Sequence, residues 1–320
     1  MLSFSYMVNH DHSTTNGHND SSSRGLGIAL IITLVIMAVE FVGGIMSHSL
    51  ALTSDAGHML VDALALGLSV VALNLAKKPA TSTRTYGFHR AEIMAALANG
   101  VTLVLISAYI FYEAYQRFRK PPTVQTSIML VVAIVGLIAN LITMRLLHHE
   151  RHSNLNVRAA FFHVFGDMIS SVGVIAGGVI IAFTGWKIID PIIAIVIGVI
   201  ILWGAFSLVR ESVGILMETV PKQIQLDKVT ETIKNVNGVV ELHDIHIWTI
   251  TSGIYALSTH ILIRDQMLSH ASEIIATINR ELEHKFNITH TTFQLECEKC
   301  DNCAQGLVCQ IQRPEETKSH

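Results

Sequence analysis

Charged residues are scarce in this sequence. They make up 15% of its 320 residues, whereas 50% of the residues are hydrophobic. A typical soluble domain has about 25% charged residues, so the composition argues against an ordinary soluble protein and indicates a membrane protein. Runs rich in Lys and Arg are absent and the net charge is only −3, so nucleic acid is not an expected partner. The start of the chain lacks the basic residues and the apolar run of a secretory signal, so no cleaved leader is expected.

Cysteine is absent from most of the chain. Its four positions all lie in the C-terminal segment 297–320, so disulfides cannot connect the rest of the fold. The overlapping C-x-x-C spacings favour metal or redox chemistry in a reducing compartment. A soft-metal site is one interpretation and reduced thiols without a function are the other. The cysteines are Cys297, Cys300, Cys303 and Cys309.

Common hydrolase motifs are absent as well. The sequence has no H-E-x-x-H, in which two histidines hold zinc and the glutamate is the general base, and no G-x-S-x-G. It also has no phosphate-binding glycine loop, and no organic cofactor is expected. An enzyme is therefore disfavoured, and a membrane-embedded metal-dependent hydrolase stays as the alternative to the function derived below.

Six long apolar segments are present, each close to the roughly 20 residues that a helix needs to cross a bilayer. They predict a six-helix transmembrane domain over residues 25–210, with both termini on one side. More Lys and Arg residues lie in the loops on that side than on the other, which places both termini in the cytoplasm. The segments are 26–46, 50–76, 91–115, 127–147, 159–184 and 188–209.

Residues 211–296 have the composition of a soluble domain. Apolar residues recur at helical spacing in 221–238, alternate in two β-rich stretches, recur again in a second helical stretch and alternate once more up to Glu296. The order α-β-β-α-β predicts a two-layer cytoplasmic α+β domain of the ferredoxin-like kind. The polar segment 1–24 and the last dozen residues are predicted to be disordered; the first contains His10, Asp11, His12 and His18, which are either weak metal ligands or a solvated tail.

Two of the apolar segments contain the pattern H-x-x-x-D. It is formed by His58 and Asp62 in the second segment and by His163 and Asp167 in the fifth. Residues four apart lie on one face of a helix, so each pair points in one direction. Ionisable residues at membrane depth are costly and usually line an ion path or a bundle interior. A helix-to-helix hydrogen bond is the simpler interpretation of one pair, but its recurrence on a second helix favours a shared site.

Two imidazoles and two carboxylates form a four-ligand set suited to tetrahedral Zn²⁺, whereas Mg²⁺ and Ca²⁺ prefer more oxygens and Cu⁺ prefers sulfur. A divalent ion neutralises the two carboxylates, and so do protons on the two histidines after the metal has left. Because protons compete with metal for imidazole, inward-moving protons can release the cation. The residues therefore predict a secondary active transporter that exchanges a divalent metal for protons.

Four stretches carry a resemblance to a known family. "SLALTSDAGHMLVDALAL", "TYGFHRAEIMAALANG", "HVFGDMISSVGVI" and "HDIHIWTITSG" follow one another in this order, together with six apolar segments and an α+β tail. The chain resembles the cation diffusion facilitator family, and most of all its bacterial cobalt–zinc–cadmium resistance exporters, over about residues 25–296. The resemblance implies a homodimer in the plasma membrane that moves Zn²⁺, and often Cd²⁺ or Co²⁺, out of the cytoplasm, with His58, Asp62, His163 and Asp167 as transport ligands.

The resemblance also implies regulatory zinc in the cytoplasmic domain, bound between subunits. The matching residues are His243, Asp244, His260, His270 and Glu296, with His246 as a possible addition and His89 as a peripheral loop ligand. Taken singly, each of these also suits an ordinary surface residue, whereas together they favour a bound metal. Asp55, near the outer end of its segment, suits either the cation exit or a helix-start cap. Glu40, Asn99 and Asn140 are interpreted as groups that orient ligands or join helices.

Overall fold

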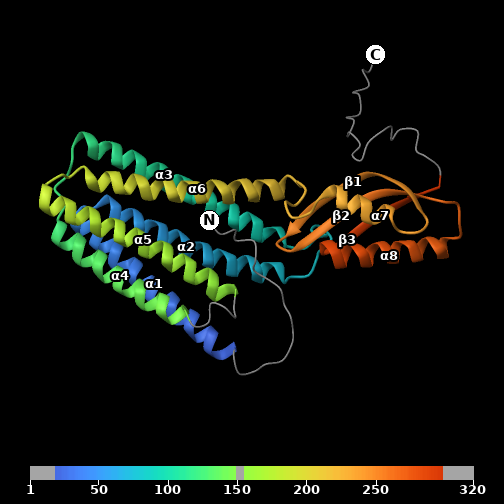
Figure 1. Cartoon of the computed structure of the whole chain (residues 1–320), viewed down its shortest axis with the longest axis horizontal. Coiled ribbons are helices and arrows are strands. Elements are labelled where there is room, and N and C mark those ends of the chain that lie inside the picture. Colours follow the sequence, from blue (N-terminus) through green and yellow to red (C-terminus); the bar gives the residue numbers. More distant parts are fainter. Residues whose placement is uncertain (1–18, 149–154, 298–320) are drawn as a thin grey trace, which may run out of the picture. The chain divides into compact units, whose positions relative to one another are not determined.

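The computed structural model describes residues 19–148 and 155–297, which divide into two compact units between Ser212 and Val213. We call them the helical unit and the C-terminal unit. Six long helices make up the described part of the helical unit (Figure 1): α1 (Asn19–Ser47), α2 (Leu50–Ala76), α3 (Arg90–Arg119), α4 (Thr126–His148), α5 (Leu155–Thr184) and α6 (Ile189–Leu216). α6 continues past residue 210, where the sequence predicts the end of the membrane domain.

Five helices in the described parts of the chain are long and apolar enough to cross a membrane, namely α1, α3, α4, α5 and α6. α2 has the length and the bounds predicted for the second segment, but it is not among the five. The structure therefore provides five candidate spans where the sequence predicts six.

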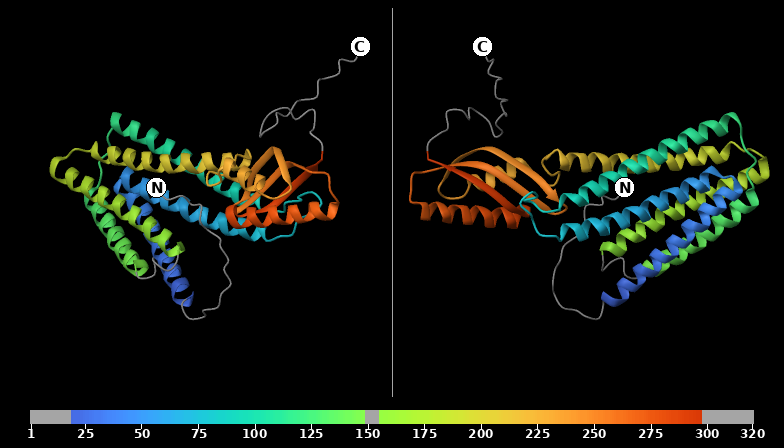
Figure 2. Two further views of the ribbon diagram at one scale, coloured as in Figure 1. Left: turned by 45° about the vertical axis from the view of Figure 1, so that its right-hand side comes forward. Right: turned by 180° about the vertical axis from the view of Figure 1, so that it is seen from behind.

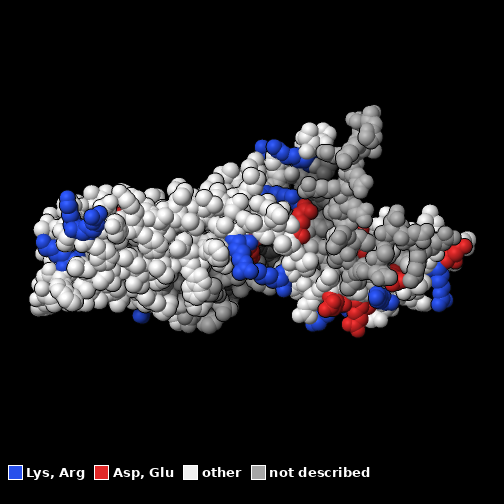
Figure 3. All heavy atoms as spheres, turned by 90° about the horizontal axis from the view of Figure 1, so that it is seen from above, with Lys and Arg blue, Asp and Glu red and all other residues white. Residues whose placement is uncertain are grey.

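Some of the helices that pack together follow one another in the sequence, and others are far apart in it. α2 lies against α1 and α3, and α4 lies against α1 and α5, as two further views make visible (Figure 2). Leu52, Leu103, Ala133 and Ile197, from four different helices, belong to one buried apolar cluster. On the face drawn in Figure 3, the middle of the helical unit is almost free of charged side chains and Lys and Arg lie towards its ends. Such an apolar belt suits a lipid environment.

The C-terminal unit has the predicted α-β-β-α-β order. Its elements are α7 (Leu226–Lys234), β1 (Val239–Thr251), β2 (Ile254–Ile263), α8 (Leu268–Phe286) and β3 (Ile288–Glu296). β1 and β2 form an antiparallel hairpin, in which Gly253 takes a φ of +77° at the turn. β3 pairs in parallel with β2, which requires the crossover that α8 provides. The sheet order is β1-β2-β3. That this unit is ferredoxin-like stays a prediction.

The two short helices pack against each other and against the sheet. Val229 and Ile233 of α7 and Ile278 of α8 are fully buried, and they share one apolar cluster with Leu257 and Ile261 of β2. Alternate residues of a strand point to opposite faces, so odd-numbered residues of β2 face this core. Even-numbered residues of β2, including His260, therefore lie on the sheet face opposite the helices.

We expect Ile278→Ala to lower the free energy of unfolding of the C-terminal unit by about 2–5 kcal/mol, because a fully buried isoleucine leaves a cavity. Hydrogen exchange of the β1, β2 and β3 amides in the full-length protein measures this change. Val240→Ala is the matched control: its side chain is 53% exposed, and we expect a change below about 0.5 kcal/mol. Equal protection in the two variants would contradict the assigned core.

Candidate functional site

The four residues of the H-x-x-x-D pairs come together between α2 and α5. Nε2 of His58 lies 3.5 Å from Oδ2 of Asp62, one turn further along α2. Nε2 of His163 lies 3.8 Å from Oδ2 of Asp167 on α5 and 3.6 Å from Oδ2 of Asp62 on α2. The two imidazole rings have centroids 6.2 Å apart and meet edge to face. Asp62 is therefore the residue that joins the two helices at this cluster.

The burial of the cluster is graded. Asp167 is 4% exposed, the side chains of His58 and Asp62 are partly buried, and that of His163 is exposed. Nδ1 of His58 and Oδ2 of Asp167 are buried and find no hydrogen-bond partner among the described residues. Buried polar atoms are normally paired, and unpaired ones need an explanation such as an ion. A metal ion bound by these side chains would explain both unpaired atoms.

The distances between the ligand atoms of these four residues are close to those of a zinc site, but the atoms do not yet surround one common point. Ligand atoms about 2.0 Å from a tetrahedral Zn²⁺ lie about 3.3 Å from one another. The three distances between carboxylate and imidazole atoms, from 3.5 to 3.8 Å, are close to that value. The four residues do not place three ligand atoms within 4.8 Å of one another. Small side-chain movements would be required to close the set.

Two further acidic groups are buried in the helical unit, one on α2 and one on α1. Asp55 on α2 is 2% exposed, and Ser170 on α5 donates a hydrogen bond of 2.7 Å to its Oδ1. Asp55 is therefore not the cap at the start of α2, one of the two interpretations that the sequence left open. Glu40 on α1 is also buried; a Cβ added to Gly136 of α4 would overlap its Oε1, and its Oε2 has no hydrogen-bond partner in the described residues.

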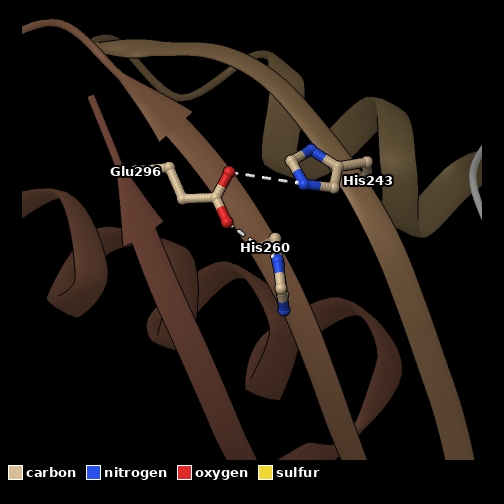
Figure 4. A group of neighbouring side chains, drawn as sticks. All are labelled: His243, His260 and Glu296. Carbon is tan, nitrogen blue, oxygen red and sulfur yellow. Dashed lines mark ion pairs between the residues drawn. The ribbon is translucent and has the colours of Figure 1, made fainter. Parts of the chain in front are cut away.

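A second cluster lies on the sheet of the C-terminal unit. Glu296, at the end of β3, forms ion pairs with histidines of both other strands: its Oε1 is 2.9 Å from Nδ1 of His260 and its Oε2 is 3.4 Å from Nε2 of His243 (Figure 4). His243 and His260 are register partners on β1 and β2, with ring centroids 5.2 Å apart. The three side chains share the sheet face that the helices leave open.

This cluster meets the geometric requirement for a metal. One ligand atom each from His243, His260 and Glu296 lies within 4.8 Å of the others, and across residues 19–148 and 155–297 no other set of three does so. Three ligand atoms of this cluster are buried and have no hydrogen-bond partner in the described structure, so the ion pairs given above are their polar contacts. They are Nε2 of His243, Nδ1 of His260 and Oε2 of Glu296. Two nitrogens and a carboxylate oxygen form the donor set of an open zinc site.

A β-bulge brings two more predicted ligands near His260. The register of β1 shifts between His243 and His246, and Asp244 within this bulge takes a φ of +51°. Oδ1 of Asp244 lies 3.0 Å from Nε2 of His246, and its Oδ2 lies 3.8 Å from Nε2 of His260. The bulge thus turns Asp244 towards the ring edge of His260 that faces away from Glu296.

The remaining predicted ligands are not brought to these clusters. His270 is exposed in the first turn of α8, and His89 precedes α3 without a side-chain cap bond. Neither belongs to a set of three close ligand atoms in the described residues. Cys297 is an exposed free thiol. Cys300, Cys303 and Cys309, and the N-terminal His10, Asp11, His12 and His18, lie outside the described residues.

One group was not found by sequence analysis. Asp190, in the first turn of α6, is fully buried and accepts hydrogen bonds from the start of α2. An aspartate followed by proline at the start of an apolar segment was the available signal, but the sequence does not indicate which helix it contacts.

Comparison with known proteins assigns the family. The model of the cation efflux transmembrane domain matches residues 26–217, and the model of the cation efflux protein cytoplasmic domain matches residues 221–298. The chain belongs to the cation efflux family. Both candidate metal clusters lie within the matched ranges, one in each domain. The resemblance drawn from the four sequence stretches is therefore confirmed.

Curated relatives align with almost the whole chain. A cadmium, cobalt and zinc/H(+)-K(+) antiporter of Bacillus subtilis is 40% identical over 310 residues, which cover 95% of this chain and 99% of the relative. The metal cation efflux system protein CzcD of Cupriavidus metallidurans is 42% identical over 287 residues, or 90% of each chain. The zinc transporter ZitB of Pectobacterium atrosepticum is 39% identical over 299 residues, covering 92% of this chain and 90% of the relative.

These matches bear on the class of protein. The family and the relatives are transporters by name, so the chain is a multi-pass membrane transporter of a bacterial type. The alternative of a metal-dependent hydrolase finds no support in them.

Proposed function

We propose that this protein exports Zn²⁺, together with Cd²⁺ or Co²⁺, from the cytoplasm in exchange for protons. The relatives named as antiporters and zinc transporters are aligned over at least nine-tenths of this chain, which supports the same activity here. The observation that carries the proposal is the meeting of His58 and Asp62 of α2 with His163 and Asp167 of α5. Two nitrogens and two carboxylates at membrane depth suit a borderline divalent ion.

The charges of the site explain why a metal ion can be exchanged for protons. A divalent ion offsets the two carboxylates of Asp62 and Asp167, and a proton on each histidine offsets them equally after the ion has left. Imidazole binds metal only in its neutral form, so protonation from the more acid side displaces the cation. Asp62, which faces both histidines, keeps a partner in either state.

The membrane arrangement follows from the proposed site. α2 is the sixth span in this proposal: it has the length and bounds of the second apolar segment, and Asp62 on it faces His163 on α5. Six spans put both termini on one side, and the distribution of Lys and Arg in the loops makes that side the cytoplasm of a bacterial cell. The C-terminal unit, which we interpret as ferredoxin-like, then lies in the cytoplasm.

The C-terminal unit is proposed to pair two copies and to bind regulatory zinc through His243, His260 and Glu296. Its family model describes a cytoplasmic dimerisation domain, which supports a homodimer. Buried ligand atoms without other partners favour a bound ion. Asp244, beside His260, is the next candidate ligand, and the exposed His270 is available to a second copy. Zinc bound between two copies shifts the equilibrium towards the closed dimer, by as much as it binds the closed dimer more tightly than the open one.

We expect the double substitution His243→Ala, His260→Ala to remove one zinc ion per chain from the purified full-length protein and to raise the zinc concentration needed for half-maximal transport by about fivefold. Transport at saturating zinc should survive, since the membrane ligands are intact. Calorimetry and vesicle uptake measure the two effects. His284→Ala, His290→Ala is the control pair from the same unit. Unchanged zinc binding would dismiss these ligands, and total loss of transport by a folded variant would dismiss a regulatory role.

The function itself is tested by uptake of Zn²⁺, Cd²⁺ and Co²⁺ into vesicles that contain the purified protein. If at least one of the three ions accumulates to a higher level than in vesicles without protein, the result supports transport. The absence of accumulation for the entire panel would contradict it.

A further inference from the structure

We infer that Asp190 is a positioning residue for transport, which ties the start of α2 to α6 and so holds the α2 ligands opposite those of α5; this inference rests on the proposed function. Asp190 contacts none of the four proposed transport ligands. Its side chain is fully buried in the first turn of α6. A buried carboxylate is costly unless hydrogen bonds and an opposite charge compensate it. The start of α2 and an arginine on α3 supply both.

The carboxylate of Asp190 caps α2 from another helix. Leu50 N donates to its Oδ2 at 2.8 Å, Ala51 N donates to its Oδ1 at 3.3 Å, and the Ser49 hydroxyl donates to Oδ1 at 2.5 Å. The next amide, Leu52 N, donates to Oγ of Ser49 at 3.2 Å. The first amides of a helix have no partner within it, and a negative charge there is favoured by the helix dipole. Asp190 and Ser49 together satisfy the first three.

Arg117 connects α3 to the same point. Its Nη1 lies 3.4 Å from Oδ2 of Asp190 and donates to the carbonyl oxygen of His48 at 2.6 Å. Its Nε donates to Glu113 one turn back on α3 at 3.1 Å. His48 takes a φ of +53° between α1 and α2, which turns its carbonyl group towards the arginine. The link between α1 and α2 is thus held by α3 and α6 together.

The cap formed by Asp190 affects the position of the metal ligands in two ways. α2 is a rigid helix that carries Asp62, and α6, which carries Asp190, directly follows α5 in the chain. Asp62 follows Leu50 by about 18 Å along the helix axis at 1.5 Å per residue. His163 lies on α5, and only residues 185–188 separate the end of α5 from α6. α2 and α5 pack mainly against other helices, not against each other. Asp190 therefore joins the end of α5 to the start of α2, and its loss frees α2 to shift or rotate.

A displacement of this kind affects metal affinity first. The approach of Asp62 Oδ2 to His163 Nε2, at 3.6 Å, is the contact between the two ligand pairs. Displacements of about 1 Å in a ligand or substrate geometry are enough to weaken a site strongly. A residue needed only for folding would lower the amount of active protein and leave the affinity of each folded molecule unchanged.

The test is Asp190→Asn in the full-length protein, reconstituted in vesicles and assayed for Zn²⁺ and Cd²⁺ uptake over a range of concentrations. We expect the KM for Zn²⁺ to rise by about tenfold, because charge-assisted hydrogen bonds to two amides and a hydroxyl are weakened. The ratio of the two KM values should change as well, since the ions differ in size. Ser49→Ala should raise the KM by about threefold, and the double variant should resemble Asp190→Asn alone, because the two groups act as one unit.

Asp227→Asn, at an exposed position of α7, is the control and should leave both KM values unchanged. Unaltered KM values in Asp190→Asn, with uptake reduced only in proportion to the folded protein, would overturn the inference. If Asp190→Asn does not fold, Ser49→Ala and Arg117→Gln decide: a raised KM in both supports positioning, and an unchanged KM in either overturns it. Wild-type protein that moves neither ion would instead overturn the proposed function.

Discussion

Asp62→Asn is expected to lower Vmax/KM for zinc uptake by at least about a hundredfold, the largest effect of any single substitution proposed for this protein. Oδ2 of Asp62 lies within 3.6 Å of an imidazole nitrogen from each helix, so this carboxylate is the point at which the two halves of the site meet. Asparagine keeps the shape of the side chain, but it removes the charge that balances a divalent ion. Uptake by reconstituted vesicles, normalised to folded protein, measures the loss.

Asn74→Ala provides a matched control, because Asn74 is an exposed polar residue of the same helix. We expect its uptake to equal that of the wild type. Near-normal transport by Asp62→Asn would exclude this residue as a transport ligand. A comparable loss in Asn74→Ala would mean that α2 tolerates no polar change and that the effect is not specific to the metal site.

His58→Asp is expected to alter which cation is preferred and how transport depends on pH. The substitution replaces a nitrogen ligand by a harder oxygen, so the ratio of Vmax/KM for Zn²⁺ to that for Mn²⁺ should fall by about tenfold. Carboxylates titrate about two units or more below imidazole, so the competition between proton and metal moves to lower pH. The rise in KM on acidification from neutral pH should therefore be shallower than in the wild type.

His148→Asp is the control for this change, because His148 is an exposed histidine at the end of α4. Its cation ranking and pH profile should match those of the wild type. If His58→Asp keeps both the ranking and the profile, His58 packs between helices and does not bind the transported ion.

The sequence predicts the elements of this protein well, because their signals are local. The bounds of α2 agree with the predicted segment 50–76, and the α-β-β-α-β order follows from apolar periodicities of 3.6 and 2 residues. The spacing of His58 and Asp62 requires a common face on any helix, and the structure has them in contact. Local spacing also explains the meeting of His163 with Asp167.

Contacts between distant segments were beyond such reasoning. No local pattern states that Asp190 caps a helix that begins 140 residues earlier, or that Ser170 donates to Asp55. The bulge that turns Asp244 towards His246 depends on how β1 pairs with β2, and pairing register is a property of the assembled sheet.

The most direct test of metal–proton exchange uses proteoliposomes of the purified wild-type protein with an acid interior and a neutral exterior. We expect Zn²⁺ to accumulate inside, and the accumulation to collapse when a protonophore removes the pH gradient and to be absent with Asp62→Asn. Zn²⁺ entry that is equally fast without a pH gradient and unaffected by the protonophore would contradict exchange for protons at this site.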